Sequence, residues 1–466
     1  MLYWSVFKNK LKAQNALIAV ASYVFYGWWD WRFLSLILFS TVVDYAIGRL
    51  LLKENDQFKR KVFLWISILV NLGFLGFFKY YNFFLDNFIE AFTFFGYEIK
   101  GNSLNIILPV GISFYTFQTM SYTIDVYRNK LTPTKDFVAF TAFVSFFPQL
   151  VAGPIERATN LLPQFYKNRE FSYGQAVEGM RQILWGLFKK VVIADNCAEY
   201  ANIIFNGSED LSGSTLIIGA LFFTFQIYGD FSGYSDIAIG TARLFGFNLM
   251  KNFSFPYFSR DIAEFWRRWH ISLSTWFRDY LYIPLGGSRG GLGMKIRNTF
   301  IIFIVSGFWH GANWTFIVWG ALNALYFLPI MLIGNNRNNL NLVAENSFLP
   351  SIKELAQVLF TFALTVFAWI FFRADSMTHA IDIISEIFSS STFTIPDFTK
   401  RHKAYFFIPL IAVFVFFEWL GRREEFALSQ IEHKWKRPVR YLVYYSVLFA
   451  IVTYAGQEQQ FIYFQF

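Results

Sequence analysis

The chain has 466 residues, of which 55% are hydrophobic, 22% aromatic and only 16% charged. These proportions exclude a soluble globular domain, which averages about 25% charged residues, and they also exclude an intrinsically disordered chain. One cysteine excludes a disulfide framework and any multi-cysteine metal centre, while the meaning of the formal charge of +9 depends on where the charges lie.

Long apolar segments recur along the whole chain. A helix needs about 20 mostly apolar residues to cross the ~30 Å hydrocarbon core of a bilayer. No cleavage site for a signal peptidase follows the first segment, so we expect it to stay in the protein as a span. We predict an all-α polytopic membrane protein with eleven transmembrane helices, at residues 13–29, 33–48, 62–78, 104–126, 180–194, 214–240, 298–310, 313–333, 355–372, 404–420 and 441–455.

Residues 137–151 are also apolar, but their end differs from that of a span. They run into residues 148–154, which contain two prolines and a glycine. A broken backbone is tolerated at membrane depth only where protein or a water-filled cavity satisfies its polar groups. The pattern therefore predicts a re-entrant segment in addition to the eleven spans.

The loop charges agree with this count. With eleven spans and one re-entrant segment, all the strongly basic loops fall on one side of the membrane and the acidic loops fall on the other. By the positive-inside rule the amino terminus is then cytoplasmic and the carboxyl terminus outside. This distribution favours a topological signal over binding of nucleic acid or another polyanion. The basic segments are 1–12, 49–61, 246–297 and 421–440, and the acidic ones are 80–101 and 195–213.

Neither an internal repeat nor a soluble domain is visible, so we predict one integral-membrane domain over residues 1–466. The longest stretch outside the spans is 246–297, which is rich in Trp, Arg and Phe and is therefore no linker. Residues 334–354 and 373–403 have the composition of ordinary polar loops.

The first candidate site lies in the sixth predicted span, in Gln226–Asp236. Asp230 and Asp236 are carboxylates six residues apart in an apolar run that also contains glycines. Ionisable residues inside a span are costly and are functional candidates for that reason. Two interpretations remain open: the carboxylates orient a histidine or a substrate, or they bind backbone amides and hydroxyls where the glycines loosen the helix.

The second candidate is the segment Phe265–Tyr280 in the long cytoplasmic stretch. It combines several tryptophans with Arg267 and Arg268, an amphipathic composition typical of an interfacial helix. His270 lies among these aromatic residues rather than in a polar loop. The residues alone favour an interfacial anchor over an active-site segment.

The third candidate is Ser306–Trp314, which contains His310 next to Trp309 and Asn313. If the membrane edge lies at Arg297, a rise of ~20 Å over 13 residues places His310 within the hydrocarbon thickness, at the base of a depression open to the outer face. A neutral imidazole there is a competent general base for a hydroxyl. A structural histidine bonded to a neighbouring helix is the equal alternative.

Other chemistries have less support. The sequence has no His-Glu-x-x-His motif, no P-loop and no Gly-x-Ser-x-Gly elbow. His270 and His310 lack an evident third ligand, so no metal site is predicted. We expect His379, His402 and His433 to be solvated surface groups in loops.

Several stretches taken together resemble the membrane-bound O-acyltransferase superfamily, in the branch that contains the membrane subunits of alginate O-acetyltransferases. The resemblance extends from about residue 20 to the carboxyl terminus. The matching stretches are Pro148–Arg157, Asp230–Gly240, Trp266–Gly287, Val305–Trp314 and Phe371–Ala374, of which Trp266–Gly287 and Val305–Trp314 are the most specific in combination.

This resemblance implies a catalytic role for His310, which matches the family's near-invariant histidine, and an active-site role for His270 at its second polar position. It also implies a ring of helices around a central tunnel. Trp309, Asn313, Asp230, Asp236, Arg267 and Arg268 are the candidate substrate-binding residues.

The implied reaction is transfer of an acetyl or other short acyl group from a cytoplasmic thioester, such as acetyl-CoA, to a hydroxyl outside. No bound cofactor is expected. The branch implies the bacterial cytoplasmic membrane and a secreted or membrane-anchored partner that modifies an extracytoplasmic polysaccharide. D-alanyl transfer from a carrier protein to teichoic acid is the second enzymatic interpretation. A proton-coupled exporter of glycan or lipid, and a non-catalytic scaffold, are alternatives of other classes.

Overall fold

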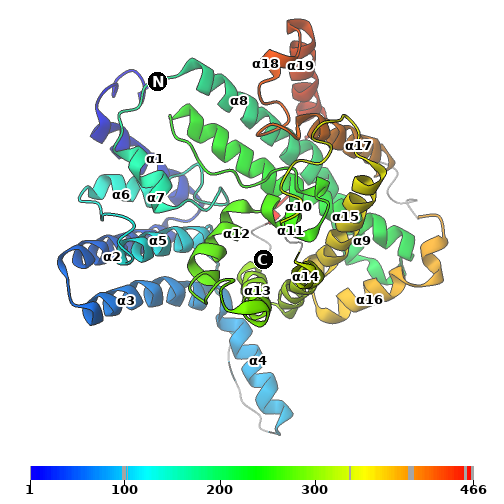
Figure 1. The fold of residues 1–466 in the computed structure, drawn as a ribbon, viewed down its shortest axis with the longest axis horizontal. Coiled ribbons are helices and arrows are strands. Elements are labelled where there is room, and N and C mark those ends of the chain that lie inside the picture. Colours follow the sequence, from blue (N-terminus) through cyan, green and yellow to red (C-terminus); the bar gives the residue numbers. More distant parts are fainter. Residues whose placement is uncertain are drawn as a thin grey trace. The chain divides into compact units, whose positions relative to one another are not determined.

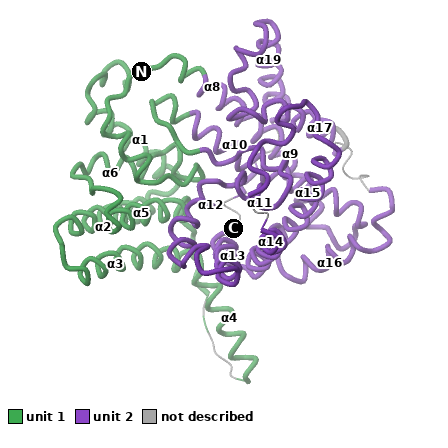
Figure 2. Tube along the Cα trace, viewed as in Figure 1, with its two compact units in different colours: residues 1–177, 241–250 green, residues 178–240, 251–466 purple. Residues whose placement is uncertain are grey.

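In the computed structural model, the described residues are 2–96, 101, 103–334, 337–396, 404–455 and 459–462. They form helices joined by turns and loops, with no β strand among them (Figure 1). The chain folds into two compact units, coloured in Figure 2: unit 1 contains residues 1–177 and 241–250, and unit 2 contains residues 178–240 and 251–466. The all-α fold is therefore confirmed, while one domain over 1–466 stays a prediction.

Unit 1 is built around a helix that is buried along almost its whole length, α5. A buried carboxylate, Asp44 of α2, binds α3 and α5 at once: it accepts hydrogen bonds from Ser67 Oγ at 2.5 Å, Asn71 Nδ2 at 2.9 Å and Thr123 Oγ1 at 3.1 Å. Such interhelical hydrogen bonds hold apolar helices together where lipid gives no hydrophobic drive. The helices of unit 1 are α1 (Leu11–Trp29), α2 (Leu34–Lys53), α3 (Gln57–Leu75), α4 (Tyr81–Phe94), α5 (Ile112–Tyr127), α6 (Phe137–Val144) and α7 (Ala158–Leu161).

Unit 2 contains both candidate histidines. Its central element is the 32-residue helix α10, most of which is buried. The helices that lie wholly or mainly in unit 2 are α8 (Tyr173–Leu187), α9 (Asp195–Asn206), α10 (Gly213–Leu244), α11 (Ile262–Arg268), α12 (Ile271–Phe277), α13 (Gly291–His310), α14 (Trp314–Ile333), α15 (Ile352–Arg373), α16 (Met377–Ile387), α17 (Ala404–Gly421), α18 (Ile431–Lys434) and α19 (Arg437–Thr453).

Every predicted span overlaps a helix. Within the described residues, six helical stretches are long and apolar enough to cross a membrane, and the apolar helix Phe407–Gly421 is shorter. The protein is thus a multi-pass membrane protein, as predicted, and the number eleven stays a prediction. The six stretches are Trp31–Lys53, Gln57–Phe94, Gly213–Leu244, Gly291–His310, Trp314–Ile333 and Ile352–Arg373.

The segment predicted to be re-entrant contains a helix too short to cross a bilayer. α6 has eight residues and ends at Val144, after which residues 145–157 form turns and irregular backbone. Most of this irregular stretch is buried in unit 1. A buried broken backbone of this kind is what a re-entrant segment requires.

Two predicted loops contain more helix than expected. Residues 80–94 of the predicted loop 80–101 are helical instead, because α3 continues through a π turn at Gly76–Tyr80 into α4. Residues 373–403 contain α16, which buries Ala380 and Ile383. In both segments charged residues suggested a loop, although a helix accommodates charge wherever one of its faces meets water.

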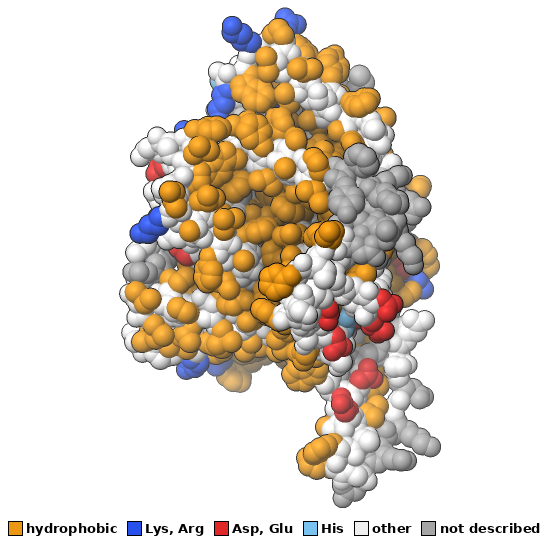
Figure 3. Space-filling view, turned by 90° about the vertical axis from the view of Figure 1, so that its right-hand side faces the viewer, with side chains coloured by type: hydrophobic (Ala, Val, Ile, Leu, Met, Phe, Trp, Pro, Cys, Tyr) orange, Lys and Arg blue, Asp and Glu red, His pale blue; other side chains and the backbone are white. Residues whose placement is uncertain are grey.

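The outer surface fits contact with lipid. Leu359 of α15 is 57% exposed and Phe416 of α17 is 51% exposed. On the face drawn in Figure 3, hydrophobic side chains merge into a broad area. Soluble monomers expose contiguous apolar patches of only about 300–600 Å², so this surface suits a bilayer.

Candidate active site

His310 is the last residue of α13 and faces into the hairpin that α13 forms with α14. Two glycines let the helices cross at very short distance. A Cβ atom at Gly307 would lie 2.1 Å from the carbonyl oxygen of Phe316, and one at Gly320 would lie 2.3 Å from that of Phe303. The glycines therefore fix the position of His310 relative to α14.

The His310 ring is 8% exposed and is enclosed by aromatic side chains. Its centroid lies 4.8 Å from Trp309, 5.3 Å from Trp319 and 5.2 Å from Phe372. Trp319 in turn stacks on Trp369 at 5.7 Å. The imidazole is therefore packed in an aromatic chamber, meaning the enclosure formed by these side chains.

The helix that ends at His310 is longer than the predicted seventh span, 298–310, while the depth of His310 in the membrane stays a prediction. α13 begins at Gly291, well before the predicted start, because the Gly-rich stretch Gly290–Gly293 continues into the helix instead of ending the turn. Its 20 residues rise about 30 Å, enough to cross the hydrocarbon core.

His270 lies between α11 and α12 in the left-handed backbone region, with φ of 44°. This conformation is uncommon for a residue other than glycine and costs on the order of 1 kcal/mol or more. It turns the side chain into the core, where the residue is only 1% exposed. The interpretation of this segment as an interfacial anchor is therefore wrong: α11 and α12 bury Phe265, Trp269 and Trp276.

The two histidines border the same aromatic cluster. The His270 ring is 6.1 Å from Trp309 and 4.6 Å from Phe231 of α10. Trp309 also packs on His310, so its indole contacts both imidazoles. The structure thus brings together three of the predicted site residues.

His270 is neutral at physiological pH. Complete burial lowers the pKa of His270 from its usual 6.5 to about 3. Its Nδ1 lies 3.0 Å from Oδ1 of Asn252, whereas Nε2 is buried and has no hydrogen-bond partner among the described residues. The ring therefore offers one unused nitrogen to whatever occupies the site.

Asp230 and Asp236 serve the helix packing. Asp230 accepts from Lys190 Nζ and from the backbone N–H of Ile462, each at 2.7 Å. Asp236 pairs with Lys189 Nζ at 2.6 Å and accepts from Gln182 Nε2 at 2.9 Å. Of the two interpretations, these contacts support the structural one.

The two lysines were missed from the sequence, although a signal for them existed. Lys189 and Lys190 lie in the apolar run predicted as the fifth span, 180–194. Buried cations in a span require partners, and Asp230 and Asp236 in the following span were the available carboxylates.

Asn313 and the two arginines bind protein groups. Asn313 caps α14 through its Oδ1, and its Nδ2 donates to the carbonyl of Asp375 at 2.9 Å. Arg267 donates to the carbonyl of Asn339 at 2.7 Å. These contacts hold the loop after α13 and the end of α11.

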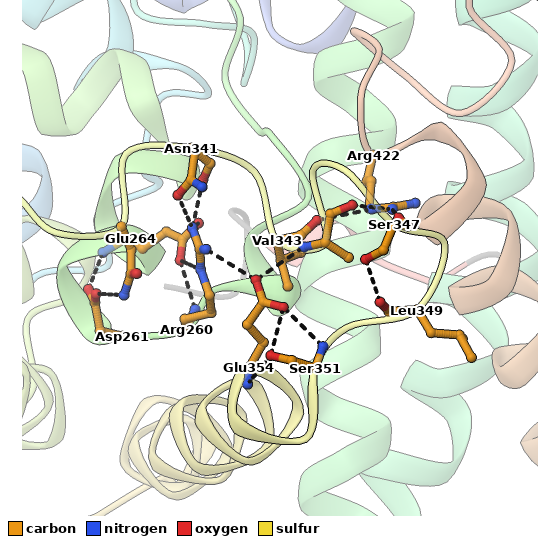
Figure 4. Close-up of polar contacts among 12 residues, drawn as sticks. Arg260, Asp261, Glu264, Asn341, Val343, Ser347, Leu349, Ser351, Glu354 and Arg422 are labelled. Atoms are coloured by element: carbon orange, nitrogen blue, oxygen red, sulfur yellow. Dashed lines mark hydrogen bonds and ion pairs between the residues drawn. The ribbon is translucent and has the colours of Figure 1, made fainter.

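Arg268 pairs with Glu264, a carboxylate that Figure 4 draws together with Arg260 and Glu354. Glu264 is 1% exposed and accepts from Arg260 Nε at 3.0 Å and from Arg268 Nη2 at 2.8 Å. Arg260 also pairs with Glu354 at 3.4 Å and donates to the carbonyl of Asn341 at 2.6 Å. Much of the positive charge of this segment is thus compensated internally.

The remaining histidines differ in exposure. His379 was expected to be solvated in a loop, which is wrong: it lies on α16, and its Nε2 is 3.1 Å from both Ser208 Oγ and the carbonyl oxygen of Phe205. The side chain of His433, on α18, is 74% exposed. His402 lies outside the described residues.

Comparison with known proteins gives consistent matches. The model of a family described as "MBOAT, membrane-bound O-acyltransferase family" matches residues 127–373, which include His270 and His310. The chain is 41% identical over 391 residues to the "Probable alginate O-acetylase AlgI" of Pseudomonas aeruginosa, covering 84% of this chain and 72% of that protein.

Two further relatives carry other names. The "Peptidoglycan O-acetyltransferase" of Helicobacter pylori is 36% identical over 403 residues, covering 81% of this chain and 74% of the relative. The "Teichoic acid D-alanyltransferase" of Bacillus subtilis is 26% identical over 288 residues, covering 59% and 71%. Similarity is thus stronger to the two proteins named for acetyl transfer.

Proposed function

The chain belongs to the membrane-bound O-acyltransferase family, and on this premise we propose that it passes an acetyl group from a cytoplasmic thioester to a polysaccharide on the other side of the membrane. The enzyme class follows from the family, and the polysaccharide from the names of its acetylating relatives. The observation that carries the proposal is that the rings of His270 and His310 pack on the same indole, that of Trp309.

The chemistry is one acyl transfer that needs no oxidant or reductant. The oxygen of the accepting hydroxyl forms a bond to the acyl carbon while the bond from that carbon to sulfur breaks. His310 takes the hydroxyl proton as general base and returns it to the departing thiolate. The products are an ester and a free thiol, so no net proton is consumed.

We assign acetyl-CoA, or another acyl thioester, as donor. A tunnel of the kind implied by the family resemblance would let the acyl group reach the chamber while the charged carrier stays in the cytoplasm. A secreted or membrane-anchored partner then delivers the acetyl group to the polymer. The chain itself lies in the bacterial cytoplasmic membrane, with its amino terminus in the cytoplasm and its carboxyl terminus outside. The positive-inside pattern of the loops supports this orientation.

Replacing His310 tests the proposal. In cells where the variant replaces the native chain, His310→Ala should lower the acetyl content of the extracellular polysaccharide, because general-base catalysis contributes about 10²- to 10⁴-fold. The exposed His433→Ala is the matched control and should acetylate like the native chain. Normal acetylation by His310→Ala, at equal amounts of protein in the membrane, would refute a catalytic role and favour export.

A further inference from the structure

Asn252 is the only residue, among those described, that hydrogen-bonds the His270 side chain. It is fully buried, at 0% exposure, in the loop between α10 and α11. Its Oδ1 lies 3.0 Å from His270 Nδ1, 2.9 Å from Ser272 Oγ and 3.4 Å from the backbone nitrogen of Ser272. Its Nδ2 lies 3.1 Å from Ser235 Oγ.

These contacts determine which way the amide points. The backbone nitrogen of Ser272 can only donate, so the atom of Asn252 that faces it has to be the acceptor oxygen. Turning the amide over would place its NH₂ group against that N–H. The orientation thus follows from the hydrogen-bond network, as amide orientations generally must.

The orientation of Asn252 in turn determines the tautomer of His270. Since Oδ1 can only accept, the hydrogen of the neutral imidazole has to be on Nδ1. Nε2 then carries a lone pair and no hydrogen. It is buried and has no partner among the described residues, a condition that costs about 1–3 kcal/mol unless a ligand or water satisfies it.

A nitrogen without hydrogen cannot donate to a developing oxyanion. Oxyanion stabilisation requires N–H or O–H donors or a positive charge. The neutral His270 of this structure is therefore unsuited to that task. What its Nε2 can bind is a group that donates a hydrogen bond.

We propose that Asn252 is a positioning residue that keeps Nε2 of His270 as a hydrogen-bond acceptor, and that the ligand of Nε2 is an N–H or O–H group of a substrate. This inference rests on the proposed function. Two substrate groups have the required chemistry: the accepting hydroxyl, and an amide N–H in the carrier arm of a CoA-type thioester. General-base work stays with His310.

The tautomer of His270 can be measured in the native chain, with one variant for assigning the signals. In the full chain labelled with [¹⁵N]histidine and reconstituted in lipid, solid-state NMR distinguishes a protonated from an unprotonated ring nitrogen. The His270 signals are assigned by their loss in His270→Gln. We expect a protonated Nδ1 and a bare Nε2 at neutral pH, and a protonated Nε2 would overturn the proposal whatever the enzyme's activity.

Two variants of Asn252 test its role. Asn252→Asp keeps an oxygen acceptor for Nδ1 and should keep the tautomer and most of the activity, whereas Asn252→Leu removes the acceptor. The Leu variant should lower kcat/KM about tenfold, the effect of one lost neutral hydrogen bond. Asn248→Leu, an exposed position in the same loop, should change nothing.

The kinetic split identifies the ligand. With acetyl-CoA as donor, and with the partner protein and alginate oligosaccharides supplied together on the acceptor side, a raised KM for acetyl-CoA in Asn252→Leu indicates the amide, and a raised KM on the acceptor side indicates the hydroxyl. An Asn252→Leu protein with native kinetics would overturn the proposal, as would an Asn252→Asp protein with the Leu defect. Failure of the native chain to release CoA would instead count against the proposed function, and the NMR measurement would still test the tautomer.

Discussion

Buried lysine–aspartate pairs hold α10 in register with the segment that follows α8. Lys189 and Asp236 have side chains that are 4% and 13% exposed, and their charged atoms lie 2.6 Å apart. α10 also carries Phe231, which packs on the His270 ring. The pairs thus hold the helix that supplies one of the ring contacts of His270.

Breaking one pair should destabilise the protein strongly. Asp236→Asn leaves the ammonium of Lys189 buried without its counter-charge, and loss of one partner of a buried pair costs about 3–5 kcal/mol. The expected result is a clear fall in Tm of the purified protein in detergent. The double variant Lys189→Met/Asp236→Leu removes both charges and should melt closer to the native chain, so a double variant that is less stable than Asp236→Asn would contradict the argument.

Glu156 gives unit 1 a pH-dependent stability. It is 1% exposed and accepts hydrogen bonds from the backbone of Met250 and, at 2.7 Å, from Asn160 Nδ2. Burial raises the pKa of Glu156 from 4.5 to about 7. Between these two pH values the folded state holds the proton more tightly than the unfolded chain does, so stability falls as the pH rises through this window.

Removing this titration should flatten the profile. Over the window the loss amounts to at most about 3 kcal/mol for a shift of this size. Glu156→Gln is uncharged at every pH, so its Tm should equal that of the native chain near pH 5 and exceed it near pH 8. Two parallel curves of Tm against pH would show that Glu156 does not titrate in this range.

The residues of the candidate site and its support differ in how readily they could be proposed from the sequence. His270 and His310 were predictable because each lies in a specific motif. Asn252 was not, since an asparagine in a polar loop has no distinguishing pattern and its role depends on a fold that brings it to His270. Lys189 was visible in the sequence as a charged residue inside an apolar run. Its structural role became clear only from its ion pair with Asp236 on another helix.

At the scale of elements, the sequence predicted helices better than their ends. Every apolar span overlaps a helix, because about 20 apolar residues have no other stable conformation in lipid. The start of α13 was misplaced because Gly290–Gly293 has the composition of a turn. α4 and α16 were missed because charged residues interrupt the apolar pattern of both segments, so that neither shows the continuous hydrophobic run of a predicted span.

The α13–α14 crossing should be intolerant of even one methyl group. In Gly307→Ala the new Cβ meets the backbone oxygen of Phe316 at 2.1 Å, which forces the helices apart at a cost of about 1–3 kcal/mol. His310 lies one turn away, and a misplacement of about 1 Å can cost roughly 10²-fold in rate. We expect a lower Tm together with a large loss of acetyl transfer.

The matched control lies on the same helix. Gly293 has nothing within 4 Å of the position a Cβ would take. Gly293→Ala should therefore be neutral or raise the stability by up to about 1 kcal/mol, because alanine favours the helix. Equal effects of the two substitutions on Tm and activity would show that helix propensity, not the close crossing, governs both sites.

At the scale of the whole molecule, the contacts within unit 2 sort its loops into two sets. These are the same two sets, inner and outer, that the loop charges predict. Loops predicted to be cytoplasmic bind one another: Arg260 reaches Asn341, and Arg422 donates to the carbonyl of Val343. Two predicted outer segments also meet, where His379 lies 3.1 Å from Ser208. Among the described contacts of these residues, none joins a predicted inner loop to a predicted outer one. This supports an odd number of membrane crossings between each inner loop and each outer loop.

Single cysteines can assign the two sides to compartments. The one native cysteine, Cys197, is buried, so a new exposed cysteine should dominate labelling by a membrane-impermeant maleimide. Lys8→Cys should label only after the cells are permeabilised, because the positive-inside rule predicts that the basic amino-terminal segment faces the cytoplasm. Glu209→Cys, in the acidic segment 195–213, should label in intact cells. If residues 137–151 were a full span, every later loop would change sides, and Glu209→Cys would be protected until permeabilisation. That single result would contradict the predicted re-entrant segment. It would also contradict the predicted outward opening on which the proposed direction of acetyl transfer depends.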